Sequence, residues 1–135
     1  MNMMNVTEES FVRSVFRKEF RDRLCYELAS PKKRDRFFDK IAHNCDEYIL
    51  GSAVYKRSDR PMSESDIVSF FGDGKEVSVV ARGSELDGRK TDIHTALKAL
   101  SENGLPFILA DAAERRAYLE TEYDFSVHTS YMLKY

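Results

Sequence analysis

Long apolar runs are missing from this sequence. No stretch approaches the length of a membrane-spanning helix, and residues 1–10 lack the apolar core of a secretory signal. The chain has only two cysteines, Cys25 and Cys45. We expect both to be free thiols, as is usual in a reducing compartment, with a single Cys25–Cys45 disulfide as the alternative. Together these absences favour a cytoplasmic protein.

Metal and phosphate motifs are also missing. The three histidines and two cysteines do not form the paired ligands at short spacing that a structural zinc site needs. The segment Gly72-Asp-Gly74 lacks the third glycine of a phosphate-binding loop, and it precedes a predicted strand instead of a helix. We therefore expect no metal and no cofactor.

No internal repeat, low-complexity tract or long linker divides the chain, so residues 1–135 are expected to form one domain. A hydrophobic fraction of 42% and a charged fraction of 33% are typical of a folded globular protein. The net charge of −2 conceals an asymmetry, because residues 13–60 hold 13 basic and 8 acidic side chains, whereas residues 61–135 hold 8 and 13. The molecule should be dipolar if the two halves do not fold over each other.

Hydrophobic spacing predicts helices first and then strands mixed with helices. Residues 1–46 should form a helical hairpin, with one helix from Thr7 to about Ala29 and a second that begins at Ser30–Pro31. Residues 47–135 should hold strands near 48–55, 77–81, 106–110 and 125–135, with helices near 64–71, 92–103 and 111–123. This order favours an α+β fold, or α/β as the alternative, in which the hairpin packs on a mixed sheet of about four strands.

Apolar spacing also predicts the core and a strand edge. The hairpin should contribute one contiguous core beneath the sheet, formed by Phe16, Phe20, Leu24, Phe37, Phe38 and Ile41. The strand over 125–135 alternates apolar and polar residues, so we expect it to be half-exposed, antiparallel or at an edge. A free edge there would allow the chain to form a homodimer.

Three arginines, Arg13, Arg17 and Arg21, follow one another at four-residue spacing beside the apolar row of the first helix. Like charges at this spacing repel each other. Other charges on the same helix pair at that spacing, as Glu19 does with Arg23. We interpret the arginine row as unpaired within the helix and therefore reserved for something outside it, either a distant acidic part of the fold or a partner.

The second helix begins with cations, which oppose the helix dipole. With the arginine row they would form one basic face on the hairpin, namely Arg13, Arg17, Arg21, Lys32, Lys33, Arg34 and Arg36. Such a face suits an acidic protein or the phosphates of a nucleic acid. The segment Ser30-Pro-Lys-Lys33 resembles the SPKK element of histone tails, which binds the DNA minor groove, but the match covers four residues and helix capping is the preferred interpretation.

A different class of function would use the loop over residues 82–94. This loop follows a predicted strand and leads into a helix, a place where open sheets bind ligands. The candidate catalytic residues there are Glu85, Asp87, Asp92 and His94, with Arg89 and Lys90 as anion contacts. A small hydrolase or transferase should gather several of these side chains, together with His128, in one pocket. A Cys45/His94/Asp92 nucleophile is a weaker version of the same hypothesis.

A binding protein should leave those catalytic candidates scattered over the fold. Because the charge pattern of the hairpin is the more definite signal, the sequence favours a small non-enzymatic binding or regulatory protein over an enzyme. The expected partner is an acidic protein or a nucleic acid.

Overall fold

The computed structural model describes residues 6–123 and 128–135. These residues form five α-helices, two short 3-10 helices (η) and six strands, in the order α1 (Val6–Val15), η1 (Lys18–Phe20), α2 (Arg21–Ala29), α3 (Arg34–Tyr48), η2 (Gly51–Ala53), β1 (Val54–Ser58), α4 (Glu64–Phe71), β2 (Glu76–Ala81), β3 (Lys90–Asp92), α5 (Ile93–Leu100), β4 (Phe107–Asp111), β5 (Arg116–Glu120) and β6 (Ser130–Lys134).

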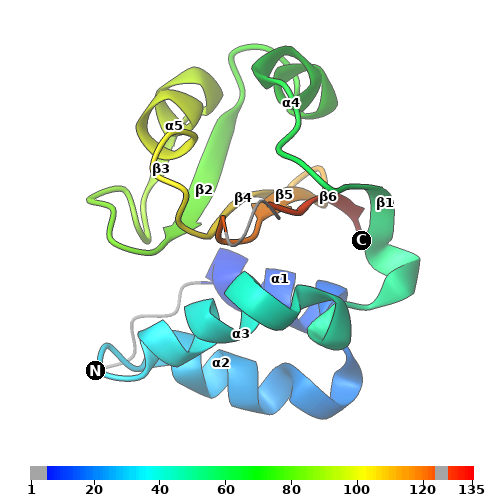
Figure 1. The fold of residues 1–135 in the computed structure, drawn as a ribbon, viewed down its shortest axis with the longest axis vertical. Coiled ribbons are helices and arrows are strands. Elements are labelled where there is room, and N and C mark those ends of the chain that lie inside the picture. The colour runs from blue at the N-terminus through cyan, green and yellow to red at the C-terminus, as the bar shows by residue number, and fades with distance from the viewer. Residues whose placement is uncertain (1–5, 124–127) are drawn as a thin grey trace.

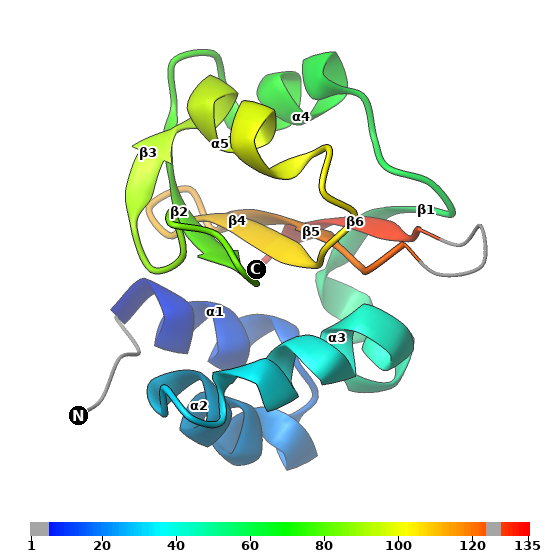
Figure 2. The same cartoon turned by 60° about the vertical axis from the view of Figure 1, so that its left-hand side comes forward.

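The six strands form one sheet that has a helical layer on each face (Figure 1). The strand order is β1-β6-β5-β4-β2-β3, and each neighbouring pair is antiparallel. Helices α1, α2 and α3 cover one face, while α4 and α5 cover the other, as the turned view in Figure 2 also shows. The predicted α+β class is confirmed, but the sheet has six strands instead of about four and is antiparallel instead of mixed.

Each face of the sheet has its own hydrophobic core. Alternate residues of β4 and β5 point to opposite faces, so that Ile108 and Leu119 join the α1–α3 core while Leu109 and Tyr118 join the α4–α5 core. The core predicted for the hairpin is largely confirmed, because five of its residues are buried there and Phe20 packs against them at its margin; those five are Phe16, Leu24, Phe37, Phe38 and Ile41.

The charge asymmetry along the chain does not correspond to an asymmetry between the two helical layers. The helices of the basic half, α1–α3, lie on one side of the sheet, and the helices of the acidic half, α4 and α5, lie on the other (Figure 1). Residues 6–48, which form α1–α3, hold 10 basic and 9 acidic side chains, so this helical layer is nearly neutral. The larger excess of cations in residues 13–60 arises because that range leaves out Glu8 and Glu9 of α1 and includes Lys56, Arg57 and Arg60 beyond α3.

The first predicted helix is broken at Phe16 and Arg17, which corrects the simple two-helix hairpin. Arg17 has an extended backbone (φ −62°, ψ 142°), and its N–H donates to the carbonyl of Tyr48 at 2.8 Å. Phe16 forms a β-bridge with Ile49, and the N–H of Leu50 donates to the carbonyl of Val15 at 2.7 Å. An apolar row spaced by four residues drifts about 40° per step around a helix. The break turns α2 so that both halves of this row reach the core.

The start of the second helix also differs from the prediction. Helix α3 begins at Arg34, and Lys33 precedes it without a side-chain cap. Ser30 was expected to cap the helix, but its carbonyl instead accepts the N–H groups of Lys33 and Arg34 at 3.0 and 2.9 Å. The residues between α2 and α3 thus form turns, and the cations of this segment lie on a corner of the molecule.

Residues 111–123 form a hairpin instead of the predicted helix. Strands β4 and β5 pair in register from Phe107 with Glu120 to Asp111 with Arg116. The turn between them contains Arg115 at φ +55°. Ala, Glu and Arg in the turn favour helix locally, but pairing buries the residues of β5 on both faces of the sheet, and this tertiary gain outweighs local propensity.

The predicted strands near 48–55 and 125–135 are shifted. Residues 48–53 end α3 and form η2, and the strand itself runs from Val54 to Ser58. The last strand begins at Ser130, and residues 125–127 of the prediction lie outside the described residues. Strand β6 pairs with both β1 and β5, so it is interior to the sheet and offers no free edge. The proposed route to a homodimer through that edge is therefore removed.

Two helix starts were predicted correctly. The side chain of Ser63 accepts the N–H of Asp66 at 3.1 Å and caps α4, which ends at Gly72 (φ +110°). Asp92 caps α5 by accepting the N–H groups of His94 and Thr95 at 3.0 and 3.2 Å. Among the described residues, no helix is both long enough and apolar enough to cross a membrane.

Candidate functional site

The three arginines of the predicted binding row have partners inside the molecule. Arg13 pairs with Glu9, four residues before it, and with Asp22, both at 3.1 Å. Arg17 donates to the carbonyl of Ile49 at 3.1 Å, and Arg21 donates to the carbonyl of Phe16 at 2.7 Å. The premise that the row is unpaired is therefore wrong.

The position of these arginines explains their spacing. Arg21 satisfies a carbonyl freed at the end of α1, and Arg17 does the same beyond the end of α3. Both side chains thus stabilise the break between α1 and η1. Binding of a partner by these arginines stays a prediction, but their hydrogen bonds and ion pairs give each of them a structural role within the fold.

Arg34 is buried and links three parts of the fold. Its guanidinium donates to Glu8 at 2.7 and 3.3 Å, to Asp87 at 2.8 and 2.9 Å, and to the carbonyl of Leu28 at 2.8 Å. Burial lowers the pKa of Arg34, but the hydrogen bonds to Asp87 and Glu8 outweigh it and raise this pKa above its usual value. Arg34, whose charge opposes the helix dipole at the start of α3, is therefore compensated by two carboxylates. Its side chain is 9% exposed.

The remaining predicted binding residues, Lys32, Lys33 and Arg36, lie at the corner between α2 and α3. None of the three has an ion pair within residues 6–123 and 128–135. Lys32 and Arg36 are exposed and Lys33 is partly exposed. Here the cations face solvent, as a binding surface requires.

An exposed aromatic ring, which the sequence prediction did not include, lies among these cations. Tyr26 is 49% exposed, with Lys33 Nζ 5.1 Å and Arg23 Cζ 5.8 Å from its ring centroid. A hydrogen bond from Lys33 and the charges of Lys33, Arg23 and Arg36 lower the pKa of Tyr26. We call Arg23, Tyr26, Lys32, Lys33 and Arg36 the basic–aromatic patch.

A shallow hollow borders the basic–aromatic patch. It has a volume of about 470 Å³, and its walls are formed by Tyr26, Ala29, Ser30, Pro31 and Lys32. Beneath the patch, the buried carboxylate of Glu27 accepts Lys40 at 2.5 Å and Arg23 at 3.3 Å. This acid neutralises Arg23 from below and leaves the charges of the other cations uncompensated.

The catalytic candidates of the 82–94 loop are not brought together. Glu85 is exposed on the loop, and Asp87 is held by Arg34 and by the N–H of Ala81 at 3.0 Å. Asp92 is the cap of α5. His94 contacts Asp73 at 2.9 Å and Glu64 at 3.4 Å, outside the loop. Three of the four candidates thus have separate structural contacts.

The hypothesis of a Cys45/His94/Asp92 nucleophile is wrong, because the cysteine lies far from the other two residues. Cys45 lies in the α1–α3 core, whereas His94 and Asp92 lie at the start of α5 on the opposite face of the sheet. Burial raises the pKa of Cys45 to about 12. Both cysteines are free, as predicted, and both are buried.

A buried acid that sequence reasoning missed lies on β5. The Glu120 side chain is 3% exposed, its Oε2 accepts the Tyr118 hydroxyl at 2.5 Å, and its Oε1 lies 3.1 Å from His128 Nε2. Burial raises the pKa of Glu120 to about 7, although the hydrogen bond from Tyr118 lowers it. A strand over 116–120 would have signalled this position, since Glu120 then shares a face with Tyr118. The helix prediction for 111–123 concealed it.

Comparisons of the chain with protein families, with curated proteins and with solved structures found no match. Its function is therefore inferred from the residues and their geometry alone.

Proposed function

We propose that this protein is a non-enzymatic binding protein that engages single-stranded nucleic acid through the basic–aromatic patch. The observation that carries the proposal is the half-exposed ring of Tyr26, which is flanked by Lys33 and Arg23 and lies beside the unpaired cations Lys32 and Arg36. The patch combines the two contacts that a single strand offers, namely stacking bases and charged phosphates.

Nucleic acid is preferred to an acidic protein because of the aromatic ring. Acidic side chains need only the cations, whereas a nucleobase also gains about 1–3 kcal/mol from stacking on an aromatic side chain. In the structure the cations lie within reach of the ring instead of away from it. A sugar–phosphate backbone that passes Tyr26 would therefore meet lysine and arginine on the same corner.

The charge layout supports this orientation. The overall charge of −2 disfavours non-specific attraction to a polyanion. Around the patch, however, residues 23–36 hold five basic and two acidic side chains, so the cations are in local excess. At an ionic strength of 0.1 M charges are screened over about 10 Å, so the local cations decide the interaction.

The enzymatic alternative in the 82–94 loop receives less support. Asp87 and Asp92 are engaged in structural hydrogen bonds, and Glu85 and His94 point to different neighbourhoods. This scattering is what we expect of a binding protein, so we give binding preference.

The test compares two triple variants that change the net charge equally. The patch variant replaces Lys32, Lys33 and Arg36 with glutamine, and the control variant replaces three exposed cations of the opposite half, Arg89, Lys90 and Lys98, in the same way. Fluorescence anisotropy with a labelled single-stranded oligonucleotide at several salt concentrations measures the binding of each. Tyr26→Phe and Tyr26→Ala separate stacking from the hydroxyl group.

The patch variant should bind more weakly, and the slope of log K against log salt should fall by about 2, because about 0.7 counterions are released for each phosphate contact on a single strand. The control variant should bind like the wild type, and Tyr26→Ala should weaken binding while Tyr26→Phe retains it. Equal losses in the two triple variants would refute the patch. If poly-glutamate binds as strongly as the oligonucleotide, and Tyr26→Ala leaves that binding unchanged, the partner is an acidic protein instead.

A further inference from the structure

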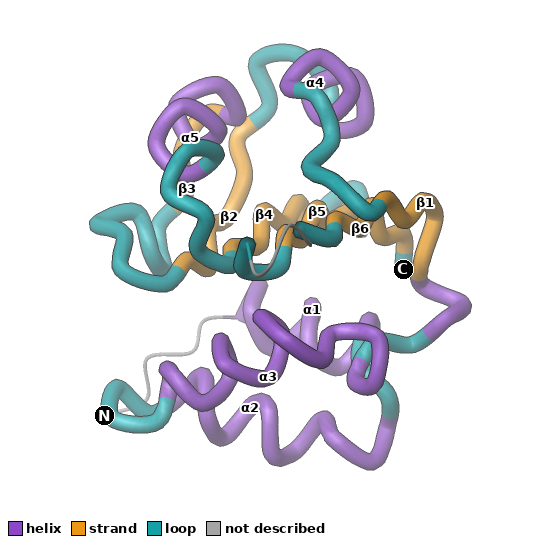
Figure 3. Tube along the Cα trace, in the orientation of Figure 1, coloured by secondary structure: helices purple, strands orange, loops and turns teal. Residues whose placement is uncertain are grey.

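A cleft lies between α4 and α5 on the face of the sheet opposite the patch. Its volume is about 400 Å³, a size that suits a small molecule. The loop between β1 and α4 closes one side, and Figure 3 shows this loop rising from the sheet to α4. The cleft is lined by Pro61, Met62, Glu64, Ile67, His94, Leu97, Lys98, Ser101, Glu102 and Glu120.

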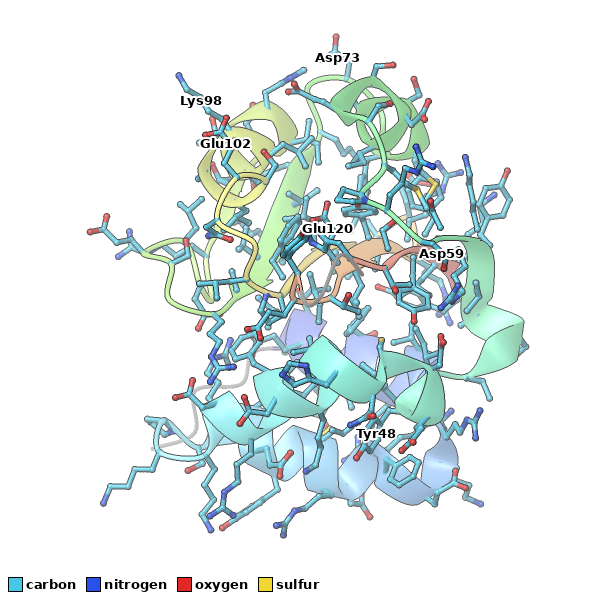
Figure 4. The ribbon with its side chains drawn as sticks, in the orientation of Figure 1. Tyr48, Asp59, Asp73, Lys98, Glu102 and Glu120 are labelled. Carbon is cyan, nitrogen blue, oxygen red and sulfur yellow. The ribbon has the colours of Figure 1, made fainter. Side chains whose placement is uncertain are left out.

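The cleft has an apolar part and a carboxylate at its inner end. Met62, Ile67 and Leu97 contribute aliphatic surface, and Ile67 and Leu97 are almost fully buried. Glu120 comes from β5 and lies at the level of the sheet, whereas Lys98 of α5 and Glu102 of the following turn lie further out (Figure 4). The cleft therefore combines aliphatic walls with a carboxylate on the sheet.

Glu120 forms a close pair with His128 beside this inner end. The Tyr118 hydroxyl donates to Glu120 Oε2, and Glu120 Oε1 lies 3.1 Å from His128 Nε2. Burial lowers the pKa of His128, so the imidazole is neutral at pH 7. A single proton on Nε2 or on Oε1 completes this pair, and Oε1 keeps a further lone pair that a ligand donor can use.

We propose that the α4–α5 cleft binds a small molecule with a primary ammonium group, which donates to Glu120 Oε1 while its alkyl part packs against Met62, Ile67 and Leu97. An ammonium supplies three N–H donors, enough to serve the carboxylate and a neighbouring acceptor. Its charge matches the carboxylate that the cleft contains at its floor. This inference is independent of the nucleic-acid proposal.

The other charged groups of the cleft favour a cation over an anion. Glu64 and Glu102 line the cleft together with Glu120, against one lysine, Lys98. His94 also lines it, but this imidazole is engaged by Asp73 at 2.9 Å and by Glu64 at 3.4 Å. A carboxylate or phosphate ligand would face net repulsion here, whereas an ammonium is attracted.

Proton linkage gives this site a distinctive signature. Burial raises the pKa of Glu120 to about 7, so near neutral pH this acid is protonated in a large fraction of the unliganded molecules. An ammonium binds the ionised form, and binding must therefore release a proton from Glu120. Because a primary alkylamine stays charged until well above pH 8, its affinity should rise about tenfold between pH 6 and pH 8.

The experiment titrates n-butylamine into the full chain at pH 6 and pH 8, with calorimetry in two buffers of different ionisation enthalpy to count released protons. Two control ligands are used. Tetramethylammonium has the charge but no N–H donor, and n-butanol has neither the charge nor an N–H donor. Glu120→Gln removes the carboxylate, and Glu76→Gln removes an exposed carboxylate of β2 as the matched control. Ser101→Trp fills the exposed rim of the cleft.

We expect n-butylamine to bind with proton release and with the tenfold pH dependence, and the two control ligands not to bind. Glu120→Gln should weaken binding at least tenfold at pH 8 and remove proton release, and Glu76→Gln should leave both unchanged. Ser101→Trp should block binding even if Glu120→Gln fails to fold. Absence of n-butylamine binding at pH 8, equal binding of tetramethylammonium, or unchanged binding in Ser101→Trp would overturn the proposal.

Discussion

Replacement of Arg34 by methionine should destabilise the protein severely, because this residue is surrounded by two carboxylates. The Arg34 side chain is 9% exposed and that of Glu8 is 1% exposed, so loss of the guanidinium would leave Glu8 buried with its main cationic partner removed. Asp87 would lose the same partner at 23% exposure. The carbonyl of Leu28 would also lose a donor.

The expected cost follows from the charges and not from the lost aliphatic contacts, since methionine replaces much of the arginine stem. Removal of one partner of a buried ion pair costs about 3–5 kcal/mol. Small domains have a free energy of unfolding of about 5–15 kcal/mol, so this loss is a large fraction of the total. With a urea m-value of about 1.5 kcal/mol per M, the midpoint should fall by about 2–3 M.

Urea unfolding followed by circular dichroism measures this shift. Arg36→Met is the matched control, because Arg36 lies two residues further along α3, is exposed and has no ion pair among the described residues. Its unfolding free energy should change by less than about 0.5 kcal/mol, as is usual for surface substitutions. Arg34→Met with a cost as small as that of Arg36→Met would refute the view that Arg34 holds the helical layer to the 82–94 loop.

Two further predictions concern the sheet and the helix break. Phe16→Ala should lower the free energy of unfolding by about 3–5 kcal/mol, since the ring is fully buried beside the break. Phe20→Ala should lower it clearly less, because Phe20 is only partly buried. Equal shifts of the two thermal midpoints would contradict this prediction. Burial raises the pKa of Glu120 from 4.5 to about 7, so between these pH values the folded state binds more protons than the unfolded state. The free energy of unfolding should therefore fall by roughly 3 kcal/mol as the pH rises through this range. Urea unfolding at pH 5 and pH 8 should show this fall, and Glu120→Gln should abolish it.

Elements whose local signals agree with the fold could be predicted from the sequence. Helices α4 and α5 start close to the predicted positions, where Ser63 and Asp92 cap them, because a capping side chain acts within a few residues of its own position. The apolar run at residues 106–110 forms β4, which is buried on both faces. In these cases periodicity, capping and burial lead to the same structure.

The misses arose where distant parts of the chain decide the local structure. The break at Arg17 depends on hydrogen bonds to residues near Tyr48, and no local residue signals it. Residues 116–120 contain good helix formers, yet they become β5 because both β4 and β6 pair with them. The true partners of Arg34 lie 26 and 53 residues away.

For the candidate site, the cations of the α2–α3 corner could be read from the sequence, because exposed lysine and arginine next to a turn remain at the surface in most folds. Tyr26 could not, since its ring fits a buried stripe as well as an exposed one and only packing shows which it is. Glu120 was hidden by the wrong element type. The distinction between structural and available arginines requires the three-dimensional contacts.

The placement of β6 inside the sheet has a consequence for how the chain folds. Strand β1 pairs only with β6, although the two are separated in the chain by β2, β3, β4 and β5. Such a long-range pair closes a large loop before it gains any hydrogen bonds, and non-local pairing slows folding. We therefore expect β1 to be the last strand to join the sheet, after β2, β4 and β5 have formed a template. Until that step, the segment after α3 is held by its contacts with Val15, Phe16 and Arg17, so the helix break acts as the early anchor of the strand that docks late.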